Sequence, residues 1–479
     1  MMSSGRTIPT TLIDGEWINL NARRQVTNPA TGEPVGTVGW GGRAEARAAA
    51  DAAAQAFPEW ANRSGRERAD LLLRAAEILK DRAEDIAGLL AMEAGKRLPE
   101  ARGEVAFSGE YLRWFAEEVR RPVGVVHNRE DEGRRHLTTS TPSGVVASLT
   151  SWNFPVSLQA RKLAPALVAG CTIVARTSEK APLAAVELIR ALHDAGVPPG
   201  VVNMVHGSGQ ELTQELLSHP GVRVVTFTGS TRVGSQIMAQ AAPRVVRPLL
   251  ELGGDAPFLV FNDADIDAAV EAAVIAKTRN SGQSCVGANR FLVEDEVHDE
   301  FTAKLAHRLD TMRLGDGANN PVPDLGPLID QQAVARMQRI VDDAVAGGSQ
   351  EATTEQEVPA MGSFVRPRLF TDVPDGALLA REEVFSPVAG VFRFSSEEEA
   401  ISRGNATEMG LAAYLFTSNM SRAWRVAEQL RAGVVGINDP VPSVAFAPMG
   451  GAKQSGIGRE GARLGLEQFM EPKYLAWRI

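Results

Sequence analysis

The chain has 479 residues, 44% of them hydrophobic and 23% charged, with a formal net charge of −9. Such a length exceeds what one hydrophobic core supports, so two or three domains are expected. The negative charge argues against nucleic acid or an anionic membrane as the main partner. No stretch of about twenty apolar residues predicts a membrane span, and residues 1–11 lack the apolar core of a signal peptide. With two cysteines and no export signal, a cytoplasmic location is expected.

The chain changes character near residue 144. Residues 44–114 are rich in Ala, Leu, Glu and Arg, with apolar positions at helical spacing, which predicts helices. Beyond Pro142-Ser143-Gly144, short apolar runs alternate with helical stretches, a pattern typical of βαβ units around a parallel sheet covered on both faces. The expected elements of this part are strands at 145–149, 172–175, 201–205 and 222–227 and a helix over 183–195.

A second α/β series starts near residue 256. A helix over 264–277 should begin at the polar cluster of Asn262, Asp263 and Asp265, which are good N-cap residue types. The other expected elements are strands at 256–261, 290–293, 388–394, 412–416 and 433–437, a helix near 297–309, and a surface excursion over 348–366. The chain is therefore predicted to form two α/β domains that divide close to Gly253-Gly254.

Cys285 is the first candidate for chemistry. It ends the run Asn280-Ser281-Gly282-Gln283-Ser284-Cys285, and a chain with two cysteines does not use sulfur as scaffolding, so this thiol is a candidate nucleophile. Three further motifs accompany it: Ser151-Trp152-Asn153-Phe154-Pro155, Leu250-Glu251-Leu252-Gly253-Gly254 and Glu382-Glu383-Val384-Phe385. In this order the four motifs resemble the NAD(P)-dependent aldehyde dehydrogenase superfamily, and the resemblance covers nearly the whole chain.

The resemblance implies a fold of three parts. A Rossmann-like NAD-binding domain is expected over residues 1–123 and 142–252, and a catalytic domain over 253–445. Residues 124–141 and 461–479 correspond to a small β element that pairs between subunits, which implies a homodimer or a homotetramer. A mobile loop and a frayed tail are the alternative interpretation of these last two segments.

The chemistry of aldehyde oxidation assigns roles to the motifs. Hydride removal from an aldehyde needs a tetrahedral intermediate, which Cys285 is expected to form by attacking the carbonyl. The Asn153 amide and the Cys285 backbone N–H are expected to stabilise the oxyanion. Glu251 is expected to activate the water that hydrolyses the resulting thioester, and Lys162 and Glu460 match family positions that relay protons away from it. Taken singly, Asn153 could be an ordinary turn residue and Glu251 a surface carboxylate.

Two glycine-containing segments compete for the phosphates of a cofactor. Gly456-Ile457-Gly458-Arg459-Glu460-Gly461 matches the dinucleotide pattern, but the residues before it cannot form the buried strand that such a turn needs, so a glycine-rich loop is expected there. Phe227-Thr228-Gly229-Ser230-Thr231-Arg232-Val233-Gly234 follows an apolar strand and opens a helix, so its amides and hydroxyl can bind an anion. In isolation a plain N-cap by Thr228 or Ser230 is the simpler interpretation, whereas the resemblance places the pyrophosphate at Gly229 and Ser230.

The resemblance also implies the remaining cofactor contacts. Glu179 would accept hydrogen bonds from the adenosine ribose and repel a 2′-phosphate, which favours NAD. Arg176 replaces the usual Lys and could tolerate that phosphate, so NADP stays open. Glu383 and Phe385 match the pair that holds the nicotinamide ribose and packs beside the ring. The cofactor set is completed by Ser151, Trp152 and Ser178.

Two arginines distinguish the substrate site. Many family members have aromatic residues eight positions after the catalytic Asn and six before the catalytic Cys, where this chain has Arg161 and Arg279. Paired guanidinium groups suit a carboxylate, which each can bind through two N–H groups; the simpler alternative pairs each arginine with a nearby Asp or Glu. The arginines resemble those of the succinate-semialdehyde dehydrogenases, in which Ser443 would supply a third contact, so succinate semialdehyde is the expected substrate.

Other functions stay open at this point. Glutarate semialdehyde or a sulfonated aldehyde would meet the same arginines, and a broad-specificity aldehyde dehydrogenase would accept long apolar aldehydes. A CoA-acylating enzyme is disfavoured by the presence of Glu251, and an inactive relative by the presence of the whole catalytic set. Gly287 stands where many members of the group have a second cysteine, so no local redox switch is expected. Cys171 is expected to be buried and structural, and no metal site is expected.

Overall fold

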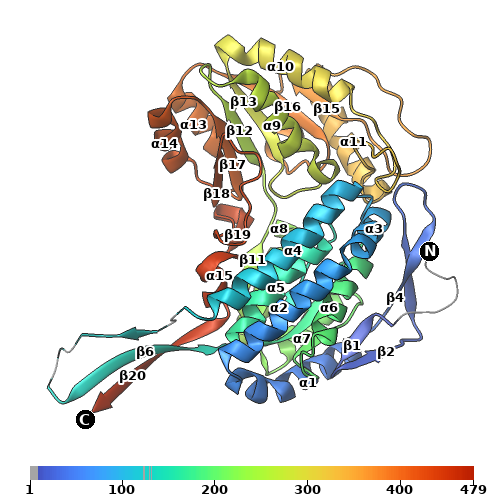
Figure 1. Ribbon diagram of the computed structural model, residues 1–479. Helices are drawn as coiled ribbons and strands as arrows, with labels where there is room; N and C mark the ends of the chain where they lie inside the picture. The colour runs from blue at the N-terminus through green and yellow to red at the C-terminus, as the bar shows by residue number, and fades with distance from the viewer. Residues whose placement is uncertain (1–8, 122–123, 129, 131, 479) are drawn as a thin grey trace.

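The computed structural model describes residues 9–121, 124–128, 130 and 132–478. Two lobes, each built on a β-sheet, and a projecting arm make up the molecule (Figure 1). The predicted α/β class with mainly parallel sheets is confirmed. Predictions that fall on residues 1–8, 122–123, 129, 131 and 479 lie outside the described residues.

The first lobe contains an eight-stranded sheet in the order β19-β11-β10-β7-β8-β9-β1-β2. Its five central strands run parallel, and β19, β1 and β2 pair antiparallel at the two ends. The strands are β1 (Thr11–Ile13), β2 (Glu16–Ile18), β7 (Val145–Leu149), β8 (Thr172–Arg176), β9 (Val202–Met204), β10 (Val222–Thr228), β11 (Arg247–Glu251) and β19 (Gly456–Ile457). A separate pair joins β3 (Arg23–Thr27) to β4 (Pro34–Gly39).

Helices cover both faces of this sheet. Successive residues of β7 face different cores: Val146 lies in the core shared with α2, α4, α5 and α6, and Val145 and Ala147 lie in the core shared with α1, α7 and α8. This alternation explains why the strand is apolar throughout. The helices of the lobe are α1 (Arg43–Asn62), α2 (Gly65–Asp81), α3 (Ala83–Ala94), α4 (Leu98–Glu118), α5 (Pro155–Ala169), α6 (Leu183–Asp194), α7 (Gly209–Ser218), α8 (Thr231–Ala241), the 3₁₀ turn Ala242–Arg244 and α15 (Ala462–Glu467).

The second lobe contains a seven-stranded sheet in the order β14-β15-β16-β13-β12-β17-β18. Again the strands are buried on both faces, since Phe258 packs in one core and Leu259 in the other. The strands are β12 (Ala256–Val260), β13 (Ala288–Glu294), β14 (Gln350–Glu351), β15 (Arg368–Thr371), β16 (Val388–Phe394), β17 (Ala412–Phe416) and β18 (Val434–Ile437). The helices are α9 (Ile266–Thr278), α10 (Asp295–Asp310), α11 (Gln331–Ala346), α12 (Leu378–Arg381), α13 (Glu397–Asn405) and α14 (Met420–Gln429), with 3₁₀ turns at Arg279–Gly282 and Lys453–Ser455.

The arm is a three-stranded antiparallel sheet of β5 (Val125–Val126), β6 (Arg134–Pro142) and β20 (Met470–Arg478). It projects away from both lobes (Figure 1). β6 and β20 pair along nine residues, so residues 470–478 form a strand and not a frayed tail. Pairing of this arm with a second subunit stays a prediction. Within the described ranges, none of the helices combines the length and the apolar character that crossing a membrane requires.

Most predicted elements are confirmed, and two interpretations were wrong. The strands predicted at 145–149, 388–394 and 412–416 have those bounds, and Asp265 caps α9 through its side chain. The excursion over 348–366 is not purely superficial, because Thr353 and Arg366 are buried. The segment predicted as a glycine-rich loop contributes the short strand β19, which pairs antiparallel with β11 because its backbone closes the edge of the sheet.

The sheet of the first lobe places several motifs at one edge. β8, β7, β10 and β11 run parallel, so the residues that follow them share the carboxyl edge: Arg176, Ser151 to Asn153, Gly229 with Ser230, and Glu251. The chain adds β8 and β9 on one side of β7 and then β10 and β11 on the other, so the strand order reverses here. Crevices at such switch points are where open α/β sheets bind ligands.

Candidate active site

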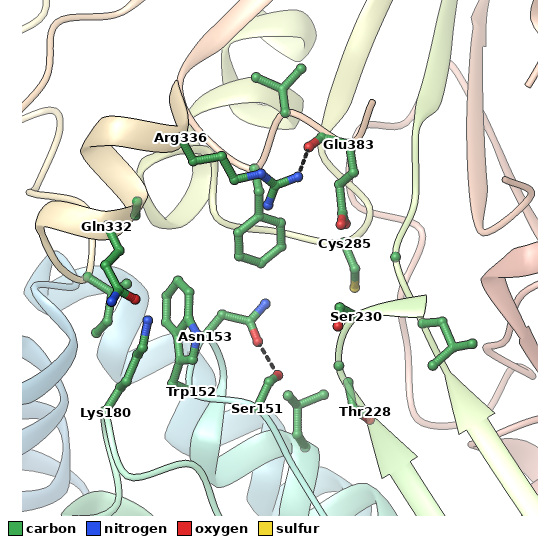
Figure 2. Close-up of a pocket in the computed structure, with 18 residues that line it drawn as sticks. Ser151, Trp152, Asn153, Lys180, Thr228, Ser230, Cys285, Gln332, Arg336 and Glu383 are labelled. Atoms are coloured by element: carbon green, nitrogen blue, oxygen red, sulfur yellow. Dashed lines mark hydrogen bonds between the residues drawn. The ribbon is translucent and has the colours of Figure 1, made fainter. Parts of the chain in front are cut away.

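Two cavities meet at Cys285. The larger, about 320 Å³, is lined by residues from the carboxyl edge of the first sheet and by Glu383 and Phe385 of the second lobe. The smaller, about 40 Å³, is lined by Arg161, Arg279 and Ser443 among others, and Cys285 lines both. In Figure 2, the Cys285 sulfur faces the larger cavity, with Ser230 on one side and Asn153 and Trp152 on the other. A group held at the thiol can therefore reach both cavities.

The loop that carries Cys285 has an unusual backbone. Asn280, Ser281 and Gly282 have φ angles of 53°, 57° and 75°, a left-handed run that costs free energy unless neighbouring contacts hold it. The Asn280 amide supplies such contacts by donating to the carbonyl oxygens of Asn153, at 3.0 Å, and Gln283, at 3.2 Å. At Gly254 the chain crosses between the lobes so close to the loop that a Cβ would lie 2.1 Å from the Cys285 carbonyl oxygen. Only glycine fits there.

The Asn153 side chain has a defined orientation. Its Oδ1 accepts a hydrogen bond from Ser151 Oγ at 2.6 Å, and its Nδ2 donates to the Gln283 carbonyl oxygen at 3.1 Å. The amide nitrogen is thus turned toward the Cys285 loop, and its second hydrogen is left for another acceptor. Asn153 is buried, which excludes the interpretation as an ordinary exposed turn residue.

The thiol of Cys285 is protonated in this arrangement. Burial, with the nearby carboxylate of Glu383 as the second cause, raises the pKa of Cys285 to about 12. Arg161 acts in the opposite direction. Because the thiolate is the nucleophile, reaction requires a base close to the sulfur.

The charges of Glu383 and, more weakly, Glu251 act on the Cys285 thiol. Glu251 is buried and lines neither cavity, and burial followed by the charge of Glu460 raises its pKa well above its ordinary value. A base that titrates closer to neutrality suits proton transfer at ordinary pH. Lys162 donates a hydrogen bond to Glu460 Oε1, and both are fully buried. The structure therefore brings Glu251, Glu460 and Lys162 into one cluster, although Glu460 lies 298 residues from Lys162 in sequence.

The larger cavity has features that fit a dinucleotide. Ser230 stands at the N-cap of α8, yet its side chain makes no capping hydrogen bond, and the buried Thr228 hydroxyl has no partner within the described residues. Ser230 thus occupies the N-cap position that the simpler interpretation predicted but without the capping hydrogen bond, so both hydroxyls can meet an anion at a helix start. Trp152 and Phe385 pack edge to face with ring centroids 5.7 Å apart on the cavity wall. Burial raises the pKa of Glu383 to about 7.

Three predicted cofactor residues lie outside this cavity, where β8 ends. Arg176 Nη2 lies 2.7 Å from Glu179 Oε2 and donates to the Gly207 carbonyl oxygen at 3.2 Å. Burial opposes ionisation of Glu179, but Arg176 outweighs it and lowers the pKa of that carboxyl. Ser178 lies between them in sequence and is buried.

The smaller cavity has a cationic wall. Arg161 Nη2 donates to Ser443 Oγ at 2.9 Å, and its Nη1 lies 4.0 Å from Glu460 Oε2, at the outer limit of an ion pair. No Asp or Glu pairs with Arg279 in the part of the chain that the structure describes, and its guanidinium lies over the Phe154 ring at 5.2 Å. The alternative that each arginine pairs with a nearby Asp or Glu therefore holds for Arg161, which reaches Glu460, but not for Arg279 among the described residues.

Comparison with known proteins decides the family. The family model described as "Aldehyde dehydrogenase family" matches residues 17–475. The chain belongs to the aldehyde dehydrogenase family. It is 44% identical to a glutarate-semialdehyde dehydrogenase of Pseudomonas putida over 97% of this chain and 96% of the relative. A 3-sulfolactaldehyde dehydrogenase of Pseudomonas putida is 43% identical with the same two coverages. A solved structure of succinate-semialdehyde dehydrogenase from Burkholderia pseudomallei has a TM-score of 0.96 at 43% identity, covering 99% of this chain and 98% of that one.

This aldehyde dehydrogenase is NAD(P)-dependent, as the resemblance implied. Several residues around its cavities were not singled out from the sequence. Lys180, Gln332 and Arg336 line the cofactor cavity, and Arg336 donates to the Glu383 carbonyl oxygen (Figure 2). Phe107 lines the smaller cavity, and the Arg161 guanidinium lies 5.5 Å from its ring centroid. No sequence motif marked these residues, because each lies in an amphipathic helix or in the segment just before one. Among the described residues, no cluster of metal-ligating side chains occurs.

Proposed function

We propose that this aldehyde dehydrogenase oxidises a short aldehyde with an anionic tail, namely succinate semialdehyde, to the corresponding acid. The observation that carries the proposal is the cavity at Cys285, which Arg161, Arg279 and Ser443 line together. Arg161 reaches Glu460 only at 4.0 Å, and Arg279 has no carboxylate partner among the described residues; a guanidinium beside a nucleophile is costly unless an anion meets it.

In the proposed reaction Cys285 forms a bond to the aldehyde carbon. Glu251 is among the charges that act on the thiol, and it takes the thiol proton as the sulfur attacks. The carbonyl oxygen becomes an oxyanion, which accepts hydrogen bonds from Asn153 Nδ2 and the Cys285 backbone N–H. The nicotinamide cofactor, when bound, supplies the acceptor of the hydride. Loss of hydride from the tetrahedral carbon leaves a thioester on Cys285.

Hydrolysis of the thioester completes the proposed cycle. The proton that Glu251 took from the thiol first leaves through Glu460 and Lys162 to solvent. Glu251 then removes a proton from a water molecule, the hydroxide attacks the thioester carbon, and the carbon–sulfur bond breaks to release the acid, while the Glu251 proton returns to the Cys285 sulfur. The net change is aldehyde, oxidised cofactor and water to carboxylic acid, reduced cofactor and a proton.

For the cofactor we propose a preference for NAD over NADP. The ionised Glu179 would accept hydrogen bonds from ribose hydroxyls and repel a 2′-phosphate, while its ion pair with Arg176 moderates that repulsion. Replacing Glu179 by Gln should lower the KM for NADP, and replacing Arg176 by Ala should raise it. Equal effects on both cofactors would contradict this assignment.

The first test is NADH formation with succinate semialdehyde, glutarate semialdehyde and hexanal. Preference for the two acids over hexanal supports the anionic site, and the ratio between the acids gives the chain length. The relatives named for glutarate semialdehyde and 3-sulfolactaldehyde make the longer acid and a sulfonated aldehyde the alternatives. Turnover of hexanal as fast as that of the acids would identify a broad-specificity enzyme and overturn the proposal.

A further inference from the structure

Lys96 and Glu104 form a fully buried ion pair behind the catalytic centre. Lys96 Nζ contacts Glu104 Oε2, and the two side chains are 0% and 2% exposed. Lys96 follows the last turn of α3, and Glu104 lies in the second turn of α4. Burying a charged pair removes both groups from water, so such a pair is weak evidence of a stabilising role by itself. The other contacts of the pair, to the backbone around Asn153, indicate a role in positioning that segment.

Each partner holds a part of the segment that carries Asn153. Lys96 Nζ donates to the Asn153 carbonyl oxygen at 2.9 Å. Glu104 Oε1 accepts the backbone N–H groups of Val156, at 2.9 Å, and Ser157, at 3.2 Å, at the start of α5. The ion pair therefore binds the backbone on both sides of the turn between β7 and α5. Movement of this turn would move the Asn153 amide relative to Cys285.

The remaining side of the Lys96 ammonium faces the substrate cavity wall. Its Nζ lies 4.0 Å from the centroid of the Phe154 ring, and the Arg279 guanidinium lies 5.2 Å from the same centroid. Cations are attracted to the face of an aromatic ring. Phe154 lines the smaller cavity with Cys285 and Arg279, so the same lysine supports both the oxyanion donor and the wall beside the substrate.

We propose that Lys96 and Glu104 are positioning residues that hold the Asn153 amide in the geometry required for oxyanion stabilisation. This inference rests on the proposed function, because it assumes that Asn153 is the oxyanion donor. Lys96 lines neither cavity and acts through the Asn153 carbonyl oxygen. Glu104 also lines the smaller cavity, and its Oε1 acts through the backbone N–H groups at the start of α5. Small displacements of a catalytic group carry large losses of rate, since one oxyanion donor contributes roughly a hundredfold to a thousandfold in kcat.

The chain offers a matched control in Glu93. This carboxylate is also fully buried and also accepts two backbone N–H groups at the start of a helix, those of Leu183 and Ala184 in α6, each at 2.7 Å. It lines neither cavity at Cys285. Burial raises the pKa of Glu93 to about 8, and Glu104 and Lys96 are among the charges that act on it. Glu93→Gln therefore reports the loss of a buried hydrogen-bonding carboxyl at a helix start without the contact to Asn153.

The test is a double-mutant cycle between Lys96→Met and Asn153→Ala. The readouts are kcat and KM for NADH formation from succinate semialdehyde, with the thermal midpoint of each variant as a record of folding. In the wild-type background, Lys96→Met should lower kcat by about 10- to 100-fold and change the KM for NAD by less than about threefold. In the Asn153→Ala background the same substitution should lower kcat by less than about threefold, because the group it positions is gone. Glu93→Gln should lower the thermal midpoint and leave kcat near that of the wild type.

Equal losses of kcat from Lys96→Met in both backgrounds would overturn the positioning role and leave the proposed function intact. An unchanged kcat in Asn153→Ala alone would instead overturn the oxyanion assignment, and the positioning role with it. If Lys96→Met does not fold because Glu104 is left without its partner, Lys96→Met/Glu104→Gln removes both charges and takes its place in the cycle.

Discussion

The cationic wall beside Cys285 allows the substrate assignment to be tested quantitatively. The change is Arg161→Met or Arg279→Met, and the readout is the ratio of kcat/KM for succinate semialdehyde to kcat/KM for butanal, which lacks the carboxylate. A hydrogen bond to a charged group contributes about 1.5–3 kcal/mol. At 1.36 kcal/mol per factor of ten, loss of one such contact should reduce the ratio roughly 10- to 150-fold.

The structure ranks the two arginines. The Arg161 side chain is 11% exposed and fixed by Ser443, so its contact with an anion is poorly screened and its loss should fall near the upper end of the range. Arg279 is half-buried and contacts the Phe154 ring, so its loss should fall near the lower end, about tenfold. Arg161 also adjoins Glu460, so its replacement should slow butanal as well. For this reason the ratio is the decisive quantity.

Arg308 provides a matched control. It lies on the wall of a neighbouring cavity that Arg279 also lines, but its guanidinium pairs with Glu271 at 2.9 Å and its side chain is 42% exposed. Arg308→Met should leave the ratio within about twofold of the wild type, as expected for an exposed ion pair. A ratio that falls no further in Arg161→Met and Arg279→Met than in Arg308→Met would refute the carboxylate site, while the family assignment would stand.

Three further predictions concern the catalytic groups. Glu251→Gln should lower steady-state kcat by about 10²- to 10⁴-fold and should also slow NADH formation in a single turnover, because Glu251 takes the thiol proton before hydride leaves. Since the pKa of Glu251 is raised, wild-type activity should fall as the pH drops through that raised value, and an acid limb of the kcat profile near pH 4.5 would contradict this. Because the pKa of Cys285 is about 12, the rate at which iodoacetamide alkylates the cofactor-free enzyme should rise about tenfold per pH unit from pH 6 to 9. Glu383→Gln should increase this rate at fixed pH, because the Glu383 carboxylate raises the pKa of the thiol. A rate that reaches a plateau below pH 9 would argue for an activated thiolate. Both cysteines are free and residue 287 is Gly, so peroxide-treated wild type should show no disulfide at Cys285 by mass spectrometry, whereas Gly287→Cys should supply a partner for one.

The buried strands were accessible to sequence reasoning because their signal is local. β16 is a seven-residue run that is apolar apart from Gly390 and the exposed Arg393, β17 is a continuous apolar run of five residues, and both have the bounds that this pattern predicts. β11, at Arg247–Glu251, was not predicted as a strand, since it is short and begins with Arg and Pro. It belongs to the sheet because it pairs with β10 over five residues, which is a non-local contact. β19 escaped prediction for the same reason.

The residues of the candidate site also fall into two groups, those that local sequence motifs reveal and those that only tertiary packing reveals. Cys285, Glu251 and Asn153 were found from short motifs, since a nucleophile, a base and an amide donor each need a particular residue type in a particular local setting. Lys96 and Glu104 carry no such signal, as a lysine and a glutamate near helix ends usually lie in solvent. Only the packing of α4 against α5 buries them beside the Asn153 backbone.

The sequence by itself determined the α/β class, the positions of most main strands along the chain and the residue types available for thiol chemistry. Hydrophobic periodicity and short motifs carry this information because they depend on a few neighbouring residues. Tertiary structure alone decided which of these residues meet. Arg161 and Ser443 are 282 residues apart, and their hydrogen bond exists because the two lobes close around one thiol. The charges of Glu251, Glu460 and Arg161 perturb one another only after the fold has removed them from water, since burial makes electrostatic interactions strong.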